Sequence, residues 1–333
     1  MLPLVPEPPE VAILPTDPED PARVRVRASD ATSGIARGEI ELRREGGRAW
    51  RTLPAEVGGD GFSAVIDDEA LRAGVYELRA RAFDAAGNER STERLPSGDA
   101  ARITLPARVR TRLRVGKREK VRARRAGRGR RRTRIVFITR PLVRNGRRVR
   151  LRGRLTAPGG NPLQGVDVEV AARVTLPGAA FQPAAALKTS RTGRFSYLVP
   201  AGPSRLVRFR YAGTPKIRSR TRHIAVRVRA SSTIHRSHRS VVNGEAVTFS
   251  GGLRGDWLPP GGKLIELQFY ARRAWRTFAT TRADAAGRWT YTYRFTGTRG
   301  TIRWKFRARI PREAGYPFAT GKSRRVRVTV RGA

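Results

Sequence analysis

The stretch GVYELRARAFD, residues 74–84, has apolar side chains at its even positions from Tyr76 to Ala82 and charged ones at the odd positions between them. Successive side chains of a β-strand point to opposite faces of a sheet, so this alternation predicts a strand with one buried and one solvated face. RVRVRAS (23–29) and GEIELRR (38–44) show the same period of two. We therefore expect antiparallel strands that cover a core on one side.

Turn residues recur about every 8–12 positions, between short segments rich in Val, Leu, Ile and aromatic residues. Long runs with the 3.6-residue period of amphipathic helices are missing. This pattern is typical of all-β sandwiches. Leu71, Gly74 and Tyr76 also have the spacing of a tyrosine corner, in which a tyrosine hydroxyl binds the backbone at a crossover between two sheets.

Two parts of the C-terminal half are diverged copies of one another. VRNGRRVRLRGRL (143–155) aligns with VVNGEAVTFSGGL (241–253) at a constant offset of 98, and TGRFSYLV (192–199) answers AGRWTYTY (286–293). A unit that recurs near 100 residues indicates an array of sandwiches rather than a solenoid of short repeats. We therefore predict three β-sandwich domains, at residues 8–106, 135–230 and 231–332.

Charge is distributed unevenly along the chain, whose formal net charge is +43. Residues 1–106 carry 14 arginines and 19 acidic residues, whereas the remainder carries 56 basic and only eight acidic residues. Such an excess favours a polyanionic partner. Residues 107–134 hold 15 basic residues and one acidic residue. Because like charges repel, we predict a disordered Arg-rich linker there.

Several motifs resemble known families. PPEV at the entry, SDATSGI (29–35) and DAAGN (84–88) make the first domain similar to a bacterial Ig-like or fibronectin-III-like module. GRLTAPGGNPLQGVDVEV (153–170) followed by TSRTGRFSYLVPAG (189–202) resembles a carboxypeptidase-regulatory-like or transthyretin-like sandwich. The third domain resembles the tandem Ig-like modules of actinobacterial surface proteins. The resemblance implies an extracytoplasmic setting, in which such modules serve adhesion, carbohydrate binding or spacing.

Composition excludes some classes of protein. With no cysteine, neither a disulfide framework nor a thiolate metal site is possible. No apolar run approaches the length of a membrane span. The start, MLPLVPEPPEV, lacks the basic flank and apolar stretch of a signal peptide, which leaves a cytoplasmic protein or a processed or truncated chain as alternatives. Following the resemblance, we expect an extracellular or cell-surface location.

The strongest candidate for a binding site is a run of arginines in the expected linker. Guanidinium groups neutralise phosphates independently of sequence, with an affinity that falls steeply as salt rises, and they bind carboxylates through the same fork. We expect an anionic polymer or cell-wall glycan as partner; non-specific nucleic-acid binding inside the cell is the alternative. A solvated linker that reflects codon bias towards arginine is the third interpretation. The run consists of Arg122, Arg124, Arg125, Arg128, Arg130, Arg131 and Arg132.

Aromatic residues gather in the third domain. Trp289 and Trp304 lie in alternating segments and are expected in its core. Trp257, in GDWLPPGG, and Tyr316 with Phe318 lie in loops, where exposed rings would stack on sugars or contact a partner. We name these three as candidates, although burial is the more frequent fate of such rings.

A weaker candidate is a calcium site formed by Asp30, Asp84 and Asn88. In an Ig-type sandwich the second and sixth strands run the same way, so the loops that follow them share a pole. Calcium needs six to eight oxygen ligands. Both loops also favour Asx turns, in which the side chain binds its own backbone. We favour the Asx turns, and expect neither a metal nor a cofactor.

The sequence does not contain the motifs of an enzyme with the residue spacing that they require. GYPFATGKSRRVRV (315–328) has five residues between Gly315 and Gly321, where a phosphate-binding loop needs four, and an alternating strand follows instead of a helix. We expect a hairpin connection there, at a pole of the third domain. The histidines, at 223, 235 and 238, lack the partners of a catalytic triad or metal site. We therefore expect a spacer, adhesion or polyanion-binding protein without enzymatic activity.

Overall fold

The computed structural model describes residues 7–122, 133–255 and 257–332, with Arg122 and Thr133 described by their backbone alone. Across these residues the regular structure is β-strand, apart from one 3₁₀ turn at Pro158–Gly160, which confirms the all-β class. No helix in these ranges is long and apolar enough to cross a membrane.

The chain divides into two compact units. Unit 1 contains the described residues up to Arg112 together with the segments Thr156–Asn161 and Tyr211–Arg220. Unit 2 contains the other described residues. Neighbouring strands in the sheets of unit 1 are antiparallel. In unit 2 two short strands, β12 (Leu142–Val143) and β20 (Ser240–Val242), run parallel to a neighbour.

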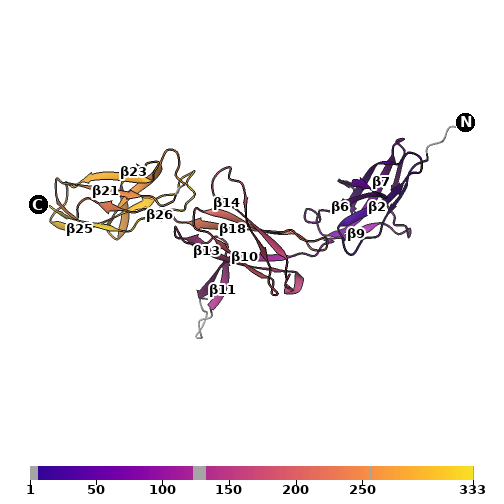
Figure 1. Ribbon diagram of the computed structural model, residues 1–333, viewed down its shortest axis with the longest axis horizontal. Helices are drawn as coiled ribbons and strands as arrows, with labels where there is room; N and C mark the ends of the chain where they lie inside the picture. Colours follow the sequence, from indigo (N-terminus) through magenta and orange to yellow (C-terminus); the bar gives the residue numbers. More distant parts are fainter. Residues whose placement is uncertain (1–6, 123–132, 256, 333) are drawn as a thin grey trace. The chain divides into compact units, whose positions relative to one another are not determined.

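Two sheets of unit 1 form the first sandwich (Figure 1). One has the strand order β1-β2-β6-β5, and the other has the order β4-β3-β7-β8, with β9 also paired to β7. This is the strand order of an Ig-type sandwich, so the topology confirms the Ig-like fold expected for this part of the chain. The strands are β1 (Glu10–Ile13), β2 (Arg23–Ser29), β3 (Ile35–Arg44), β4 (Arg51–Leu53), β5 (Glu56–Gly58), β6 (Gly61–Val65), β7 (Gly74–Asp84), β8 (Glu89–Thr92) and β9 (Arg102–Leu105).

The predicted alternation places the core between these two sheets. In β7 the even positions from Tyr76 to Ala82 are buried, and Val24 and Val26 of β2 belong to the same core cluster. The Tyr76 hydroxyl donates a hydrogen bond to the Arg72 carbonyl oxygen at 3.0 Å. The strand and the tyrosine corner predicted around residues 74–84 are therefore confirmed.

Unit 2 contains two further pairs of sheets, and the larger sheets of the two pairs share one strand order. The second sandwich consists of the sheets β11-β10-β13-β16 and β12-β18-β17-β14-β15. The third consists of β19-β21-β24 and β20-β27-β25-β22-β23, with β26 paired to β25. The shared strand order is consistent with the internal repeat that the offset of 98 predicts, and the repeat stays a prediction. The exact domain bounds given above stay a prediction.

The strands of unit 2 have the following bounds. The second sandwich has β10 (Arg112–Arg122), β11 (Thr133–Ile138), β12 (Leu142–Val143), β13 (Val149–Thr156), β14 (Asp167–Val174), β15 (Gln182–Lys188), β16 (Arg194–Val199), β17 (Arg205–Tyr211) and β18 (Arg220–Val228). The third has β19 (His235–Arg236), β20 (Ser240–Val242), β21 (Ala246–Gly252), β22 (Lys263–Ala271), β23 (Ala274–Ala283), β24 (Arg288–Arg294), β25 (Thr301–Ile310), β26 (Gly321–Lys322) and β27 (Val326–Arg331).

One glycine in each copy gives the repeat a physical basis. Gly153 of β13 pairs with Phe195 of β16, and Gly251 of β21 pairs with Trp289 of β24. A Cβ atom at Gly153 would lie 2.1 Å from the Phe195 ring, and one at Gly251 would lie 2.3 Å from the Thr233 carbonyl oxygen and 2.6 Å from the Trp289 ring. The aromatic ring of the neighbouring strand thus lies over each glycine, and a larger residue there would displace it.

The expected disordered linker is wrong over part of its length. Residues 112–122 form β10, which pairs with β11 in a hairpin (Figure 1). Leu113 and Val115 of β10 are buried, so apolar burial outweighs the repulsion between the arginines that alternate with them. Residues 123–132 of the expected linker lie outside the described residues.

The segment GYPFATGK connects strands, as expected, and also contacts the second sandwich within unit 2. The Ala319 N–H donates to the Val228 carbonyl at 2.7 Å, and the Ala230 N–H donates to the Ala319 carbonyl at 2.8 Å. A Cβ atom at Gly321 would lie 1.7 Å from the Ala230 oxygen. The backbone of Ala230 lies so close to Gly321 that no side chain fits there. This packing explains why the sequence has a glycine before Lys322, where it resembles a phosphate-binding motif.

Candidate functional site

The structure describes little of the expected arginine run. Arg122 ends β10, where its backbone pairs with Thr133 of β11. The remaining residues of the run lie outside the described residues, and its role in binding stays a prediction. These residues are Arg124, Arg125, Arg128, Arg130, Arg131 and Arg132.

A basic cleft of 760 Å³, which we call the β25–β27 cleft, lies on the third sandwich. Alternation along β25 buries Phe306 and Ala308, which leaves Arg303 and Arg307 on the opposite face of the sheet. Strands β19 and β27 and the segment between β26 and β27 add further basic side chains. Six arginines and one lysine line the cleft, namely Arg236, Arg303, Arg307, Lys322, Arg324, Arg325 and Arg327.

The positive charge of this cleft is not neutralised by the protein. Its lining contains no acidic residue, and none of the seven basic side chains has an ion pair in the described part of the chain. Arg327 pairs directly with Lys305 across β25 and β27, an arrangement of like charges that destabilises a sheet. The Nε of Arg236 is buried without a hydrogen-bond partner among the described residues. A bound anion would relieve both penalties.

Arg307 is held in a fixed position in the β25–β27 cleft. Its guanidinium carbon lies 4.1 Å from the centre of the Trp275 ring, and its Nε donates a hydrogen bond to Oε1 of Gln268 at 2.9 Å. Partial burial, followed by the charge of Arg309, lowers the pKa of Arg307. A guanidinium stacked in this way is an oriented fork for phosphate or carboxylate.

A second basic cleft, of 500 Å³, lies on the second sandwich, and we call it the β12–β13 cleft. Leu142, Val143 and Val149 supply its apolar lining. Lys117 forms an ion pair with Glu119, whereas the other basic side chains of the cleft have none in the described part of the chain. The basic lining consists of Lys117, Arg118, Arg144, Arg147, Arg148, Arg150 and Arg152.

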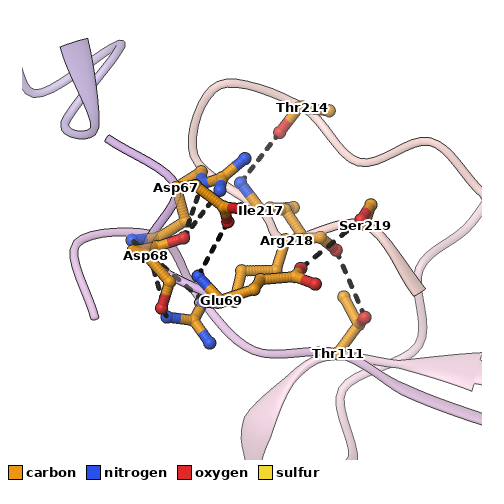
Figure 2. A network of polar contacts seen from close by, with 9 residues as sticks. Asp67, Asp68, Glu69, Thr111, Thr214, Ile217, Arg218 and Ser219 are labelled. Carbon is orange, nitrogen blue, oxygen red and sulfur yellow. Dashed lines mark hydrogen bonds and ion pairs between the residues drawn. The ribbon is translucent and has the colours of Figure 1, made fainter. Parts of the chain in front are cut away.

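In unit 1, by contrast, acidic and basic side chains form ion pairs. Asp68 is the most buried residue among these pairs, with 1 % of its surface exposed (Figure 2). Its carboxylate accepts hydrogen bonds from the N–H, Nε and Nη2 of Arg108 at 2.6–3.1 Å and from the Nε of Arg218 at 3.1 Å. Burial raises the pKa of Asp68, but the hydrogen bonds and charge of Arg108 and the bond from Arg218 outweigh it, so the pKa lies below its usual value.

This network holds the segment Tyr211–Arg220 inside unit 1. The Arg218 N–H donates to the Val109 carbonyl at 2.9 Å, and the Thr111 hydroxyl donates to the Arg218 carbonyl at 3.3 Å. Figure 2 shows Glu69 and Ser219 beside them, with the Ser219 hydroxyl 3.4 Å from the Glu69 carboxylate. The carboxylate of Asp68 accepts hydrogen bonds from both guanidinium groups, so their charge is paired within unit 1. We therefore assign this site a structural role.

Two of the three loop aromatics proposed for stacking are buried. Tyr316 and Phe318 are each 4 % exposed, and their ring centres lie 5.0 Å apart. The Nζ of Lys263, itself fully buried, lies 5.3 Å from the Tyr316 ring centre. Backbone bonds to the second sandwich pull this loop inwards, so these two rings cannot stack on a ligand. Trp257 is 41 % exposed and keeps its candidate role.

The expected Asx turns are present at the weak calcium candidate. The Oδ1 of Asp30 accepts hydrogen bonds from the backbone N–H groups of residues 32–34 at 2.5–3.1 Å, and the N–H of Ser33 does most to lower the pKa of Asp30. The Asp84 carboxylate accepts bonds from the backbone and side-chain amides of Asn88 at 2.8 and 2.7 Å. Within the described ranges, no group of three or more His, Cys, Asp or Glu side chains could hold a metal ion.

The histidines are spread over separate positions. His235 is exposed in β19, and the Nδ1 of His238 lies 3.0 Å from the Ser237 hydroxyl. The ring of His223 lies 5.9 Å from that of Phe181. We therefore find no support for a catalytic assignment at these side chains.

Neither basic cleft was expected from the sequence. A signal was present, because IRWKFRARI (302–310) places a basic residue at every second position and RVRVTVR (325–331) does so except at Thr329. Basic residues at every second position of a single strand indicate only a solvated face. The cleft forms because β25 and β27 are neighbours in the sheet, which brings their basic side chains together, and because the tertiary fold adds Arg236 to them.

No model of a known protein family matches this chain. No curated protein matches it either. A tetra-tandem repeat in the extending region of a large adhesion protein is 14 % identical, with a TM-score of 0.30, and the match covers 96 % of this chain and 74 % of that one. The ICAM-5 D1–D4 ectodomain fragment is 14 % identical, with a TM-score of 0.33, covering 98 % and 78 %. The chicken CNTN1 FN1–FN3 domains are 14 % identical, with a TM-score of 0.23, covering 97 % and 98 %.

Likenesses of this degree support no conclusion about function. The strand orders and the lining of the clefts define the class of protein by themselves, as an Ig-like β-sandwich protein whose basic side chains gather in clefts.

Proposed function

We propose that this chain is a non-enzymatic modular protein, outside the cytoplasm or at the cell surface, that serves as a spacer or adhesion module and binds polyanions. The observation that carries the proposal is the β25–β27 cleft, whose described lining contains seven basic side chains and no acidic one. Unpaired like charges lower the stability of a compact domain, so such a cluster is better explained by a ligand than by folding.

The spacer role is supported by the way the sandwiches of unit 2 are joined. The Ala319 N–H donates to the Val228 carbonyl and the Ala319 carbonyl accepts from the Ala230 N–H. The Ser204 N–H donates to the Pro317 carbonyl at 2.8 Å. Such bonds restrict motion between consecutive sandwiches, which a spacer needs. The extracytoplasmic location rests on the resemblance of the sequence motifs to surface modules.

The polyanion would be a cell-wall polymer or glycan that carries phosphate or uronate groups. Arginine forks bind both groups bidentately, and the arginine run at 122–132 would extend the contact beyond the two clefts. Trp257 offers an exposed ring for a sugar. Binding of nucleic acid inside the cell is the second candidate, because the same clefts would neutralise a phosphodiester backbone.

Binding of the full chain to cell-wall material and to duplex DNA, measured side by side across a salt series, tests the proposal. We expect binding to wall material to persist at salt concentrations that abolish DNA binding, because contacts of defined geometry depend less on counterion release. Stronger binding to DNA at every salt concentration would favour the second candidate. Absence of binding to either material at physiological salt would refute a polyanion-binding role.

A variant of the arginine run separates its contribution from that of the folded clefts. Gln in place of Arg124, Arg125, Arg128, Arg130, Arg131 and Arg132 should weaken retention on a polyanion and leave the thermal unfolding of both units unchanged. A parallel loss of folding would show that the run belongs to a core.

A further inference from the structure

The β25–β27 cleft is too large and too rich in donors for one small anion. Its volume of 760 Å³ lies in the range of pockets that enclose a whole organic ligand. Basic side chains line it from β19 to β27, and six of the seven are arginines. Each guanidinium offers five N–H donors. The cleft is therefore matched to a ligand with several anionic groups in a row.

The donors favour phosphate over carboxylate. Inside a linear polymer a phosphate group carries one negative charge and two non-bridging oxygens, as a carboxylate does. Its tetrahedral geometry lets guanidinium forks approach these oxygens from more than one plane, whereas the oxygens of a carboxylate lie in a single plane. The Arg307 fork is fixed by Trp275 and Gln268, and the structure gives it no further side-chain hydrogen bond among the described residues. Arg327 and Lys305 lie directly opposite one another, where one bridging phosphate would relieve their repulsion.

The aromatic side chains disfavour single-stranded nucleic acid. Proteins that bind single strands stack successive bases on exposed aromatic rings. Trp275 is the single aromatic residue in the described lining of the cleft, and the Arg307 guanidinium covers one face of its ring. A phosphate chain without bases needs no such platform.

We propose that the β25–β27 cleft binds a stretch of a linear polymer that carries phosphate groups at close spacing and no stacking bases. Arg303, Arg307 and Arg327 form the central contacts, and the buried Nε of Arg236 gains a partner at the inner wall. This inference rests on the proposed polyanion-binding function and assigns it a site and a ligand class.

Titration of the full chain with sodium polyphosphate at about 0.15 M salt tests the inference. In the cleft variant, Arg303→Gln, Arg307→Gln and Arg327→Gln are combined. In the control variant, Arg191→Gln, Arg276→Gln and Arg299→Gln remove three exposed arginines that lie outside both clefts and have no ion pair in the described part of the chain. Both variants have the same net charge, so a difference between them reports position and not total charge.

We expect the cleft variant to lose at least tenfold in affinity for polyphosphate. Its slope of log affinity against log salt should fall in magnitude by about two, because three phosphate contacts are removed. The control variant should bind within about twofold of the original chain. Polyphosphate should also change the fluorescence of the original chain through Trp275, and this change should disappear in a Trp275→Phe variant.

A variant that conserves charge separates a loss of binding from a loss of folding. Lysine at positions 303, 307 and 327 keeps the charge but removes the forks, and we expect it to keep its thermal midpoint and to bind polyphosphate more weakly than the original chain. Unchanged binding by this lysine variant would show that fork geometry plays no part.

The outcomes distinguish this inference from the proposed function. An equal loss of affinity for polyphosphate in the cleft and control variants would show that the β25–β27 cleft is not the binding site. Tighter binding of polygalacturonate or of single-stranded DNA than of polyphosphate would show that the proposed ligand class is wrong. Inorganic phosphate that binds as tightly as polyphosphate would show a site for one anion instead of a chain. A chain that binds no polyanion at all would refute the proposed function itself.

Discussion

Asp68 accepts hydrogen bonds from Arg108 and Arg218, which lie 40 and 150 residues away in the sequence. The carboxylate is fully buried, whereas the two arginine side chains are 20 % and 11 % exposed. Without the carboxylate, two partly desolvated guanidinium groups would face one another. Breaking a buried ion pair by removing one partner costs more than the pair contributes net, because the other charge stays buried.

We predict that Asp68→Asn lowers the free energy of unfolding of unit 1 by about 3 kcal/mol. The exchange of backbone amide hydrogens in β6 and β7, followed by mass spectrometry, would measure the loss locally. Asp67→Asn is the matched control, because Asp67 is exposed and should change stability by less than about 0.5 kcal/mol. Equal losses in the two variants would show that the network with Arg108 and Arg218 does not stabilise unit 1.

Glu313 gives unit 2 a dependence on pH. Burial opposes ionisation, but hydrogen bonds from Lys263, the Leu264 N–H and Arg282 outweigh it and lower the pKa of Glu313 from 4.5 to about 2. A carboxyl whose pKa is depressed on folding stabilises the fold above its unfolded pKa, and this contribution is lost as the pH falls through the folded value.

We therefore predict that the stability of unit 2 falls as the pH is lowered from about 4.5 to about 2. Urea unfolding at a series of pH values would measure it. Glu313→Gln should be less stable at neutral pH, because the buried Lys263 loses its partner, and should show a flatter dependence in this window. An identical pH dependence in the variant would assign the acid sensitivity to other carboxyl groups.

Among the elements, β13 and β21 show how a repeat is preserved by packing. Each contains a glycine that lies under the aromatic ring of its partner in β16 or β24. The two sequences around these glycines differ at most other positions, yet both keep the glycine and the ring. Added atoms at such positions force the backbone or the ring to move, which costs about 1–3 kcal/mol in a packed interior.

We predict that Gly153→Ala and Gly251→Ala each destabilise unit 2 by about 1–3 kcal/mol, measured by urea unfolding. Gly252→Ala is the control, since a Cβ atom there would meet its nearest neighbour, the Thr233 hydroxyl, at 3.9 Å. A loss at Gly252 as large as that at Gly251 would point to a general intolerance of β21 and not to the contacts of Gly251 with the Thr233 carbonyl and the Trp289 ring.

At the scale of the whole molecule, the two halves of the sequence manage charge in different ways. Residues 1–106 balance 14 arginines with 19 acidic residues, and the remainder has 56 basic residues against eight acidic ones. The charged side chains of unit 1 are largely arranged in ion pairs, such as Arg79 with Glu41 at 2.7 Å. Among the described basic side chains that line the two clefts of unit 2, only Lys117 has such an ion pair. Repulsion between like charges should therefore weaken unit 2.

We predict that raising the salt concentration from about 0.02 M to about 0.5 M, where the Debye length falls below about 10 Å, stabilises unit 2 and leaves unit 1 unchanged or slightly weaker. Calorimetry of the full chain would measure the two transitions, and Asp68→Asn would identify the one that belongs to unit 1. Sodium chloride is the suitable salt, because sulfate would occupy a phosphate site. A uniform shift of both transitions would contradict the prediction.

Local chemistry was enough to predict much of this protein. The alternation in GVYELRARAFD, the tyrosine corner at Tyr76 and the Asx turn at Asp30 all rest on interactions within a strand or a loop. Their physical basis is the two-residue period of the strand and the short reach of a turn. Such features are present in the sequence because they need no distant partner.

The tertiary structure alone decided the rest. Whether β10 is a strand or a linker depended on the core that buries Leu113 and Val115, and whether Tyr316 is exposed depended on a loop that binds another sandwich. The β25–β27 cleft exists because the register between distant strands brings basic side chains to one place. Composition determined that this protein carries a large positive charge, and long-range packing determined where that charge gathers.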